Sequence, residues 1–213
     1  MSEANIKFWA AMSRRYDSFI DKVLGENIRH KILEKLNEEK NSGRLIEFGC
    51  GTGYFTKTLA NKSENIVSTD ISEEMLEIAK ERLKGIEFQV MDIQDCKFDD
   101  ETFDTAFMGL VLLFADDPKK ALKESRRILK PESKLIIADP DISFLSSYEM
   151  LRFRIRALLK YRRIPSTGHL LNQKTILDML DNTGFEIAGK EIIQDKSNSS
   201  SVSANYIKAI NKK

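Results

Sequence analysis

One stretch near residue 50 constrains the fold more than any other. Residues 45–56, Leu-Ile-Glu-Phe-Gly-Cys-Gly-Thr-Gly-Tyr-Phe-Thr, pass from an apolar strand into closely spaced glycines, and we call residues 49–53 the glycine turn. Glycine lacks a Cβ, so the turn can adopt left-handed backbone angles and a ligand can approach the backbone, while N–H groups at the start of a following helix face that ligand. The stretch therefore predicts a strand–turn–helix unit that binds a nucleotide-like ligand.

The common dinucleotide-binding pattern, Gly-x-Gly-x-x-Gly, does not fit this stretch. Counted from Gly49, the position of the third glycine holds Tyr54, and counted from Gly51 it holds Thr56. The sequence instead reads acidic-x-Gly-x-Gly-x-Gly, with Glu47 as the acid. These residues disfavour a nicotinamide-dependent dehydrogenase, which we keep as an alternative.

Predicted helices and strands alternate along most of the chain. Helical periodicity over residues 4–39 predicts one or two helices before the first strand. Strands are expected at residues 44–48, 65–70, 86–91, 103–108 with an apolar continuation to 114, 134–139, 186–195 and 202–210. Helices are expected at about residues 53–61, 72–84, 117–129 and 172–184. The alternation indicates parallel βαβ units with right-handed crossovers, closed by a hairpin.

Acidic residues follow two of the predicted strands. Parallel sheets bind ligands beyond the carboxyl ends of their strands, where Asp70 and Asp92 fall. A carboxylate at Asp70 suits both hydroxyls of a ribose, and one at Asp92 suits the exocyclic amine of adenine, with the Ile93 backbone N–H available to a ring nitrogen. Ile71 and Met75 provide apolar cover for the adenine faces.

Taken together, these motifs resemble the class I S-adenosylmethionine-dependent methyltransferases. The segment from Phe103 to Phe114 and the Arg-Ile-Leu-Lys-Pro of residues 127–131 also look like this family's fourth strand and following helix end, although Glu132-Ser133 replace the usual pair of glycines. The resemblance implies one domain over residues 1–213 with an α/β, Rossmann-like, doubly wound sheet of seven strands. This sheet is expected to be mostly parallel, with a C-terminal antiparallel strand and helices on both faces.

The resemblance also implies a cofactor and its binding residues. The cofactor is S-adenosyl-L-methionine, and S-adenosyl-L-homocysteine is the product left after transfer. The matching residues of the family line the methionine part, hold the ribose and bind the adenine. They correspond here to Glu47, Gly49, Gly51 and Gly53 for the methionine part, Asp70 for the ribose, and Asp92 for the adenine, with Ile71, Met75, Ile93 and Gly109 beside them at the strand ends.

The N-terminal residues 1–40 are expected to form a helical lid. Tyr16-Asp17 is similar to a Tyr-Asp found in small-molecule and quinone methyltransferases, where it closes over the methionine end, so Tyr16 joins the predicted cofactor-binding residues. Residues 13–17 are polar apart from the tyrosine, and a solvated junction between helices is the alternative.

Residues 142–171 are expected to form a basic helical insertion over the acceptor site. An apolar stripe at Leu151, Ile155, Leu158 and Leu159 stands against many arginines and lysines and a single acid, Glu149. A solvated outer face explains such charges, and a weak contact of residues 144–163 with an anionic membrane surface or an anionic acceptor is the alternative.

Composition excludes several functional classes. Lys and Arg total 34 against 33 Asp and Glu, so no overall charge draws the chain to nucleic acid. The cysteines Cys50 and Cys96 form no metal-binding spacing and are expected to be small buried fillers. The chain lacks an apolar run of membrane-spanning length, and we expect a cytoplasmic protein without a bound metal.

The sequence thus predicts methyl transfer to a small-molecule acceptor by in-line displacement. Such a reaction needs mainly alignment and exclusion of water, and a base only when the acceptor must lose a proton. Asp139, His169 and Tyr16 are candidates for that base, and the sequence ranks none of them. A quinone or lipid-precursor methyltransferase at the membrane surface and a non-catalytic cofactor-binding partner protein stay as alternatives, and the oligomeric state is open.

Overall fold

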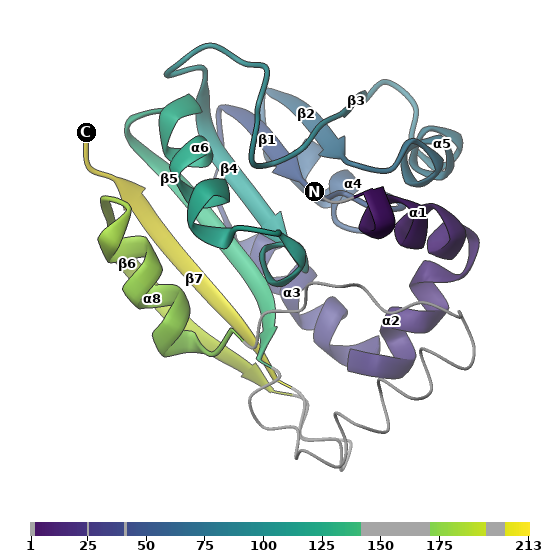
Figure 1. Ribbon diagram of the computed structural model, residues 1–213. Coiled ribbons are helices and arrows are strands. Elements are labelled where there is room, and N and C mark those ends of the chain that lie inside the picture. The colour runs from purple at the N-terminus through teal and green to yellow at the C-terminus, as the bar shows by residue number, and fades with distance from the viewer. Residues whose placement is uncertain (1–2, 25, 41, 142–170, 195–202) are drawn as a thin grey trace.

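The protein is described by a computed structural model that covers residues 3–24, 26–40, 42–141, 171–194 and 203–213 (Figure 1). Its described residues form one seven-stranded sheet with the order β3-β2-β1-β4-β5-β7-β6. The strands are β1 Arg44–Phe48, β2 Asn65–Asp70, β3 Glu87–Val90, β4 Phe103–Gly109, β5 Leu129–Asp141, β6 Phe185–Gln194 and β7 Ser203–Asn211.

Strand β7 runs against its neighbours. The pairs from β3 through β5 are parallel, whereas β7 is antiparallel to both β5 and β6. The winding reverses between β1 and β4, which are neighbours although two strand–helix units separate them in sequence. The predicted fold is confirmed, and its switch point lies where β1 and β4 end.

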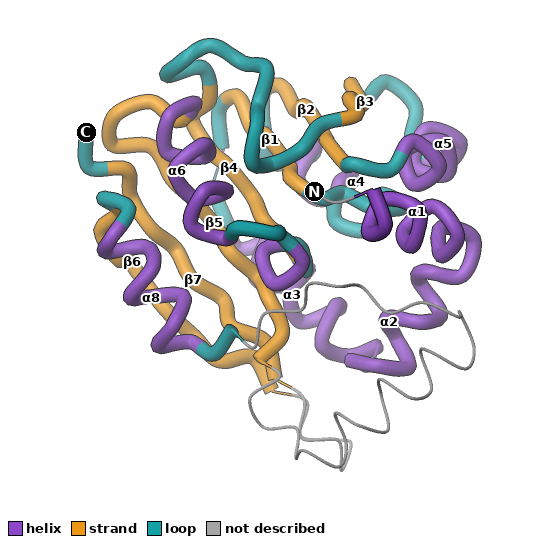
Figure 2. Tube along the Cα trace, in the orientation of Figure 1, coloured by secondary structure: helices purple, strands orange, loops and turns teal. Residues whose placement is uncertain are grey.

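Helices cover both faces of the sheet. They are α1 Glu3–Met12, η1 Ser13–Arg15, α2 Tyr16–Leu24, α3 Glu26–Glu38, α4 Thr56–Ala60, α5 Glu73–Arg82, η2 Leu112–Phe114, α6 Pro118–Ile128 and α8 Gln173–Asn182. Helices α6 and α8 pack on one face and α3 and α4 on the other, as Figure 2 shows. Each face thus has its own apolar core, one with Ile137 and Ile207 and the other with Ile136 and Tyr206.

Three of the predicted helix starts are confirmed by the structure. Ser72, Asp117 and Asn172 each cap a helix, with side chains that accept hydrogen bonds from backbone N–H groups in the first turn. Pro118 occupies the first turn of α6, where a missing N–H costs nothing. These three caps follow the ends of β2, β4 and β5, so the helices begin at the edge where the predicted ligand site lies and return the chain to the opposite edge.

The structure corrects the predicted continuation of the fourth strand. Residues 109–114 are apolar, but β4 ends at Gly109 and Leu110 has a φ of 59°, followed by the short helix η2. The Leu110 N–H donates to the carbonyl of Ala138 (3.1 Å) and the Val111 N–H to Asp139 (2.9 Å). These bonds to the end of β5 offset the backbone strain and turn the chain across the sheet edge.

Other element boundaries also differ from the prediction. Lys130 and Pro131 belong to β5, which begins directly after α6, and an irregularity at Glu132 with a φ of 58° restores the register with β4. The helix after the glycine turn begins at Thr56 rather than near residue 53. Three α-helices and a 3-10 turn precede β1, against the one or two helices expected. The predicted insertion at 142–171 lies outside the described residues except for buried Leu171.

Candidate functional site

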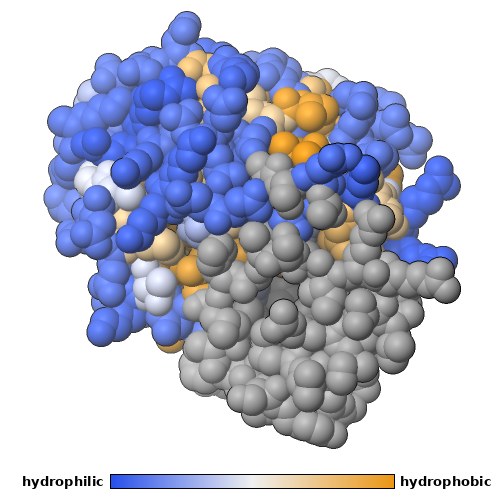
Figure 3. All heavy atoms as spheres, in the orientation of Figure 1, coloured by the Kyte–Doolittle hydropathy of each residue, from blue (hydrophilic) through white to orange (hydrophobic). Residues whose placement is uncertain are grey.

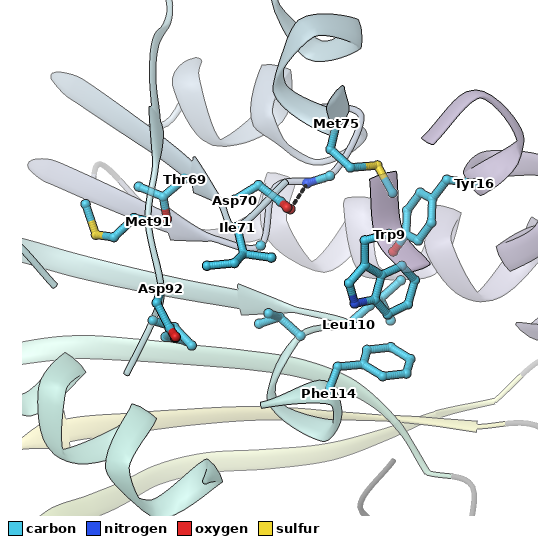
Figure 4. Close-up of a pocket in the computed structure, with 14 residues that line it drawn as sticks. Trp9, Tyr16, Thr69, Asp70, Ile71, Met75, Met91, Asp92, Leu110 and Phe114 are labelled. Atoms are coloured by element: carbon cyan, nitrogen blue, oxygen red, sulfur yellow. Dashed lines mark hydrogen bonds between the residues drawn. The ribbon is translucent and has the colours of Figure 1, made fainter. Parts of the chain in front are cut away.

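A pocket lies at the carboxyl ends of β1, β2 and β4, with Trp9 and Tyr16 of the N-terminal helices at one side of it (Figure 4). Most of the predicted cofactor residues line it: Tyr16, Gly49, Gly51, Asp70, Ile71, Met75, Asp92 and Ile93. The lining also includes residues that the sequence did not single out: Trp9, Thr69, Met91, Leu110, Val111 and Phe114. The predicted residues Glu47, Gly53 and Gly109 are not part of the lining and lie behind it.

The glycine turn needs glycine for two separate reasons. Gly49 and Gly51 have φ angles of 62° and 53°, which residues with a Cβ rarely adopt. In addition, a Cβ on Gly49 would lie 2.4 Å from Cγ2 of Val111, and one on Gly51 would lie 3.3 Å from the ring of Tyr16. The turn is therefore in close contact with both the loop after β4 and the N-terminal helices.

Asp70 fixes the glycine turn from the end of β2. Its Oδ2 accepts a hydrogen bond from the Gly51 N–H (2.9 Å), drawn in Figure 4, and its Oδ1 accepts one from the Ser72 N–H (2.9 Å). Burial raises the pKa of the Asp70 carboxyl, and the N–H donors of Ser72 and Gly51 counteract the rise. Each carboxylate oxygen has a further lone pair, so Asp70 can hold the turn and accept from a ligand hydroxyl together.

Glu47 supports the turn from below the pocket. Its Oε2 accepts hydrogen bonds from Thr56 Oγ1 and Ser68 Oγ, both at 2.7 Å, and the side chain is fully buried. Burial raises the pKa of this carboxyl to about 7. The carboxyl thus joins β1 to β2 and to the start of α4.

Gly53 and Gly109 also serve packing. A Cβ on Gly53 would lie 3.0 Å from Leu83, at the end of α5. One on Gly109 would lie 2.7 Å from the ring of Phe107 and 3.1 Å from that of Phe55. Both glycines therefore allow elements behind the pocket to approach one another.

Asp92 lies at the other end of the pocket, after β3. Its Oδ1 accepts hydrogen bonds from the backbone N–H (2.9 Å) and the side-chain amide (3.2 Å) of Gln94. The Gln94 amide oxygen in turn accepts from the N–H of Asp117 (2.7 Å), the cap of α6. Ile93 is buried beside this carboxylate, so a polar acceptor and an apolar surface are adjacent.

Aromatic side chains close the pocket above Asp70. Trp9 makes edge-to-face contacts with Phe114 (centroids 4.7 Å apart) and Tyr16 (6.0 Å), and we call these three residues the aromatic trio. Met75 of α5 packs in the same cluster as Trp9. Burial and the neighbouring Asp70 carboxylate raise the pKa of the Tyr16 hydroxyl, which therefore stays protonated as a hydrogen-bond donor. Through the aromatic trio, α1, α2 and η2 each contribute one side chain to the lining of the same pocket.

Asp17 connects the N-terminal helices to the glycine turn. Its carboxylate accepts hydrogen bonds from Thr52 Oγ1 (3.0 Å) in the turn, from Arg82 (2.7 Å) of α5 and from Arg29 (3.1 Å) of α3. Arg29 is buried and also stacks on Tyr54, 3.8 Å from the ring centre. Residues 13–17 thus include side chains engaged in the site: Tyr16 lines the pocket, and Asp17 joins its helix to the glycine turn.

Among the other candidates, Asp139 is buried at the end of β5, with its Oδ1 bonded to the Val111 N–H (2.9 Å). Burial raises the pKa of the Asp139 carboxyl to about 7. His169 lies outside the described residues. Cys50 and Cys96 are buried free cysteines.

Searches of the described residues for two other features found none. In the ranges that the structure covers, no group of His, Cys, Asp or Glu side chains could hold a metal ion. The helices described here also include none that is long and apolar enough to cross a membrane.

Some of the lining residues that the sequence analysis missed could have been predicted from the sequence, and others could not. Leu110 and Val111 follow a parallel strand at its carboxyl end, a position that itself predicts contact with a ligand. Trp9 and Phe114 reach the pocket only through the packing of α1 against η2, for which the sequence holds no local signal.

The composition of the pocket fits an adenosyl ligand without phosphates. Its charged groups are the carboxylates of Asp70 and Asp92, which bind hydroxyl and amino groups and repel phosphates. No Lys or Arg is among the described residues that line it. Ile71, Met75 and Ile93 supply the apolar surface that a purine requires.

Comparison with known proteins agrees with this chemistry. Residues 46–137 match a family described as a methyltransferase domain. The chain is 32% identical over 176 residues to the uncharacterized protein MJ1123 of Methanocaldococcus jannaschii, covering 82% of this chain and 78% of that protein. It is 29% identical over 203 residues to a demethylmenaquinone methyltransferase of Thermotoga maritima, covering 86% and 88%.

A solved structure shows the same fold. An S-adenosylmethionine-dependent methyltransferase of Thermotoga maritima superimposes with a TM-score of 0.71 at 24% identity, covering 96% of this chain and 100% of that one. The order and direction of the strands, the lining of the pocket and these matches lead to one conclusion. The chain belongs to the class I S-adenosylmethionine-dependent methyltransferases, and S-adenosylmethionine is its cofactor.

Proposed function

We propose that the enzyme transfers the methyl group of S-adenosylmethionine to a small-molecule acceptor. The observation that carries this proposal is the aromatic trio, because Trp9, Tyr16 and Phe114 line the same pocket as Asp70 and come from elements above the sheet edge. A wall of aromatic side chains favours an apolar or aromatic acceptor that packs against them.

The cofactor-binding roles that we propose follow from the position of each residue. Asp70 accepts the ribose hydroxyls, Asp92 accepts the adenine amine, and the Ile93 N–H donates to a ring nitrogen. Ile71 and Met75 cover the adenine faces. Gly49, Gly51 and Tyr16 border the methionine part, while Glu47, Gly53 and Gly109 act indirectly by holding the turn and its neighbours in place.

When bound, the sulfonium supplies an already activated methyl group. The residues of this chain then have to align the acceptor and exclude water. The aromatic trio serves both needs, since its edge-to-face packing excludes water and aromatic faces attract a positive charge.

A transfer experiment tests the small-molecule proposal. The enzyme is incubated with S-adenosylmethionine labelled in its methyl group and a cell extract separated into low-mass and macromolecular fractions. We expect label in a low-mass product, identified by mass spectrometry, and less of it for Trp9→Ala when both enzymes are saturated with cofactor. Label confined to protein or nucleic acid would contradict the proposal.

A quinone or lipid-precursor acceptor at a membrane surface is the second candidate. The match to the Thermotoga maritima demethylmenaquinone methyltransferase favours it, because the match spans 86% of this chain and 88% of that protein. The basic stripe that motivated this alternative, residues 144–163, lies outside the described residues.

Flotation with vesicles tests the second candidate. The chain is expected to float with vesicles containing anionic lipid and to stay behind with neutral vesicles. Replacing the arginines of residues 152–163 by glutamate is expected to abolish flotation. Equal behaviour with both vesicle types, or flotation unaffected by the charge reversal, would count against a membrane-surface enzyme.

A further inference from the structure

Two polar residues lie opposite each other where β5 and β7 meet the site edge. Asp139 pairs with Asn205 in the antiparallel ladder, so their side chains are on the same face of the sheet. The next pair on that face, Asp141 and Ser203, is also polar, whereas the preceding pair, Ile137 and Ile207, is apolar. All of these polar residues are buried, with Asp139 and Asn205 both 0% exposed.

Four side-chain atoms of these residues form no hydrogen bond. Within the described part of the chain, they are Asp139 Oδ2, the oxygen and the nitrogen of the Asn205 amide, and Ser203 Oγ. Buried polar atoms in folded proteins nearly always have a partner, and each one without a partner destabilises the fold. Unpartnered atoms concentrated on one face indicate a place that a polar ligand group completes.

The same group lies beside the cofactor pocket. Asp139 uses its other oxygen, Oδ1, to accept from the N–H of Val111, which lines that pocket. The negative charge of Asp139 also acts on the Tyr16 hydroxyl, where it adds to the effects of burial and of Asp70 in raising the pKa. Tyr16 is in the aromatic trio, so the unpartnered group is on the side of the pocket where we place the acceptor.

The free atoms select a particular chemistry. In the ionised form of Asp139, Oδ2 accepts a hydrogen bond, while the Asn205 amide offers one nitrogen that donates and one oxygen that accepts. A hydroxyl group satisfies both residues, because its O–H donates to Asp139 and its oxygen accepts from the Asn205 nitrogen. An ammonium group could donate to Asp139 and to the Asn205 oxygen, but it would leave the Asn205 nitrogen without a partner and would also have to lose its hydration in a fully buried place, which is costlier for a cation than for a neutral hydroxyl. A carboxylate would be repelled by Asp139.

We propose that Asp139 and Asn205 form a binding site for a hydroxyl group of the methyl acceptor. This inference rests on the proposed small-molecule function and names the acceptor class as a hydroxyl compound, such as an alcohol or a phenol. It does not decide which atom receives the methyl group, since a bound hydroxyl also orients its neighbours.

Binding of small aromatic probes tests the site without turnover. The enzyme saturated with S-adenosylhomocysteine is titrated with phenol, with toluene, which has the same shape but no hydroxyl, and with benzylamine, which carries an ammonium, and binding is followed by NMR. We expect phenol to bind about tenfold more tightly than toluene, because a site built for a hydroxyl rejects an analogue that leaves its groups unpaired.

Two substitutions and one control locate the effect. Asp139→Asn keeps an oxygen for the Val111 N–H but replaces the accepting Oδ2 by a donor, and Asn205→Leu removes the amide at similar size. Both are expected to remove the preference for phenol over toluene. Ser133→Ala is the control, because Ser133 is a buried, unpartnered hydroxyl at the opposite end of the same strand, and the preference should persist.

The outcomes separate this inference from the proposed function. Absence of phenol binding, equal affinity for phenol and toluene, tighter binding of benzylamine, or a preference that survives in both variants would each overturn the hydroxyl site. If one variant fails to fold, the other still gives the answer. Label found only in macromolecules would instead overturn the small-molecule proposal, and the probe titration would be unaffected by that result.

Discussion

Two sides of the pocket are built in different ways. The glycine turn is held by its own backbone, with the Gly51 N–H bonded to Asp70 and the Cys50 N–H bonded to the carbonyl of Thr69 (2.9 Å each). The N-terminal helices are held by side chains, through Asp17 and the aromatic trio. The difference indicates that the cofactor side is part of the sheet, whereas the helical side depends on side-chain contacts for its position.

The largest effect on cofactor affinity is expected from a substitution that removes the hydrogen bonds of the glycine turn. Asp70→Ala leaves the N–H groups of Gly51 and Ser72 without their acceptor and removes the proposed ribose contact. Charged hydrogen bonds of this kind contribute about 1.5–3 kcal/mol each, so affinity for S-adenosylhomocysteine should fall by about 100-fold or more. Calorimetry measures it.

A matched control for this change is Asp95→Ala. Asp95 is an exposed aspartate paired with Lys97 (2.6 Å) in the loop after β3, away from the turn. Its replacement should leave the affinity unchanged. An Asp70→Ala enzyme that binds the cofactor product normally would contradict the role assigned to this carboxylate and the contrast between the two sides.

An intermediate effect is expected from detaching the helical side. Asp17→Ala removes the bonds to Thr52 and Arg82 that join the N-terminal helices to the turn and α5. These bonds are partly exposed, so we expect about tenfold weaker binding of S-adenosylhomocysteine and faster hydrogen exchange in α1 and α2, with the sheet unchanged.

Asp21→Ala is the comparison for this variant. Asp21 pairs with the same buried Arg29 (2.8 Å) but lies within the helical region. It should disturb the local packing and leave the connection to the turn intact. An equal loss of affinity for S-adenosylhomocysteine in both variants would show that the pairing of Arg29, and not the link from Asp17 to the glycine turn, determines the effect of the N-terminal helices on binding.

The smallest effect concerns the support behind the turn. Burial raises the pKa of Glu47 from 4.5 to about 7. Between these two pH values the folded protein keeps a proton on Glu47 that the unfolded chain has released. This contribution to stability is fully present below pH 4.5 and is lost as the pH rises through about 7. In Glu47→Gln this loss is absent.

Thermal unfolding from pH 4.5 to pH 8 measures the difference. We expect the melting temperature of Glu47→Gln, relative to that of the unaltered protein, to increase by a few degrees as the pH rises over this range. A difference in melting temperature that stays constant with pH would show that Glu47 has the same pKa in the folded and the unfolded chain. That result would contradict the raised pKa of its buried carboxyl.

The same contrast explains what the sequence could predict. Asp70 was predicted because it ends a strand at the carboxyl edge of the sheet, where a carboxylate suits the hydroxyls of a ribose. Gly49 and Gly51 were predicted because their roles depend on the local backbone, since positive φ angles require glycine. The caps Ser72 and Asn172 were predicted for the same reason. Local physical rules are readable in a single sequence because the partners are a few residues apart.

The missed features depend on contacts between distant segments. The apolar run at 109–114 has a strand pattern, but bonds to Ala138 and Asp139 on β5 bend it at Leu110. Trp9 and Phe114 meet across the pocket by tertiary packing. The Asp139–Asn205 pair depends on the register of β5 with β7, which no local pattern specifies.

Val111 contacts both the glycine turn, on the cofactor side, and Asp139, in the proposed acceptor site. Its N–H is bound by Asp139, and its side chain fills the space beside Gly49 that a Cβ would occupy. A ligand group that shifts Asp139 therefore shifts the contact over the glycine turn, and a cofactor that shifts the turn is felt at Asp139. Because coupling between two binding equilibria is reciprocal, the cofactor and the acceptor are expected to act as heterotropic effectors, each changing the affinity of the other by the same factor.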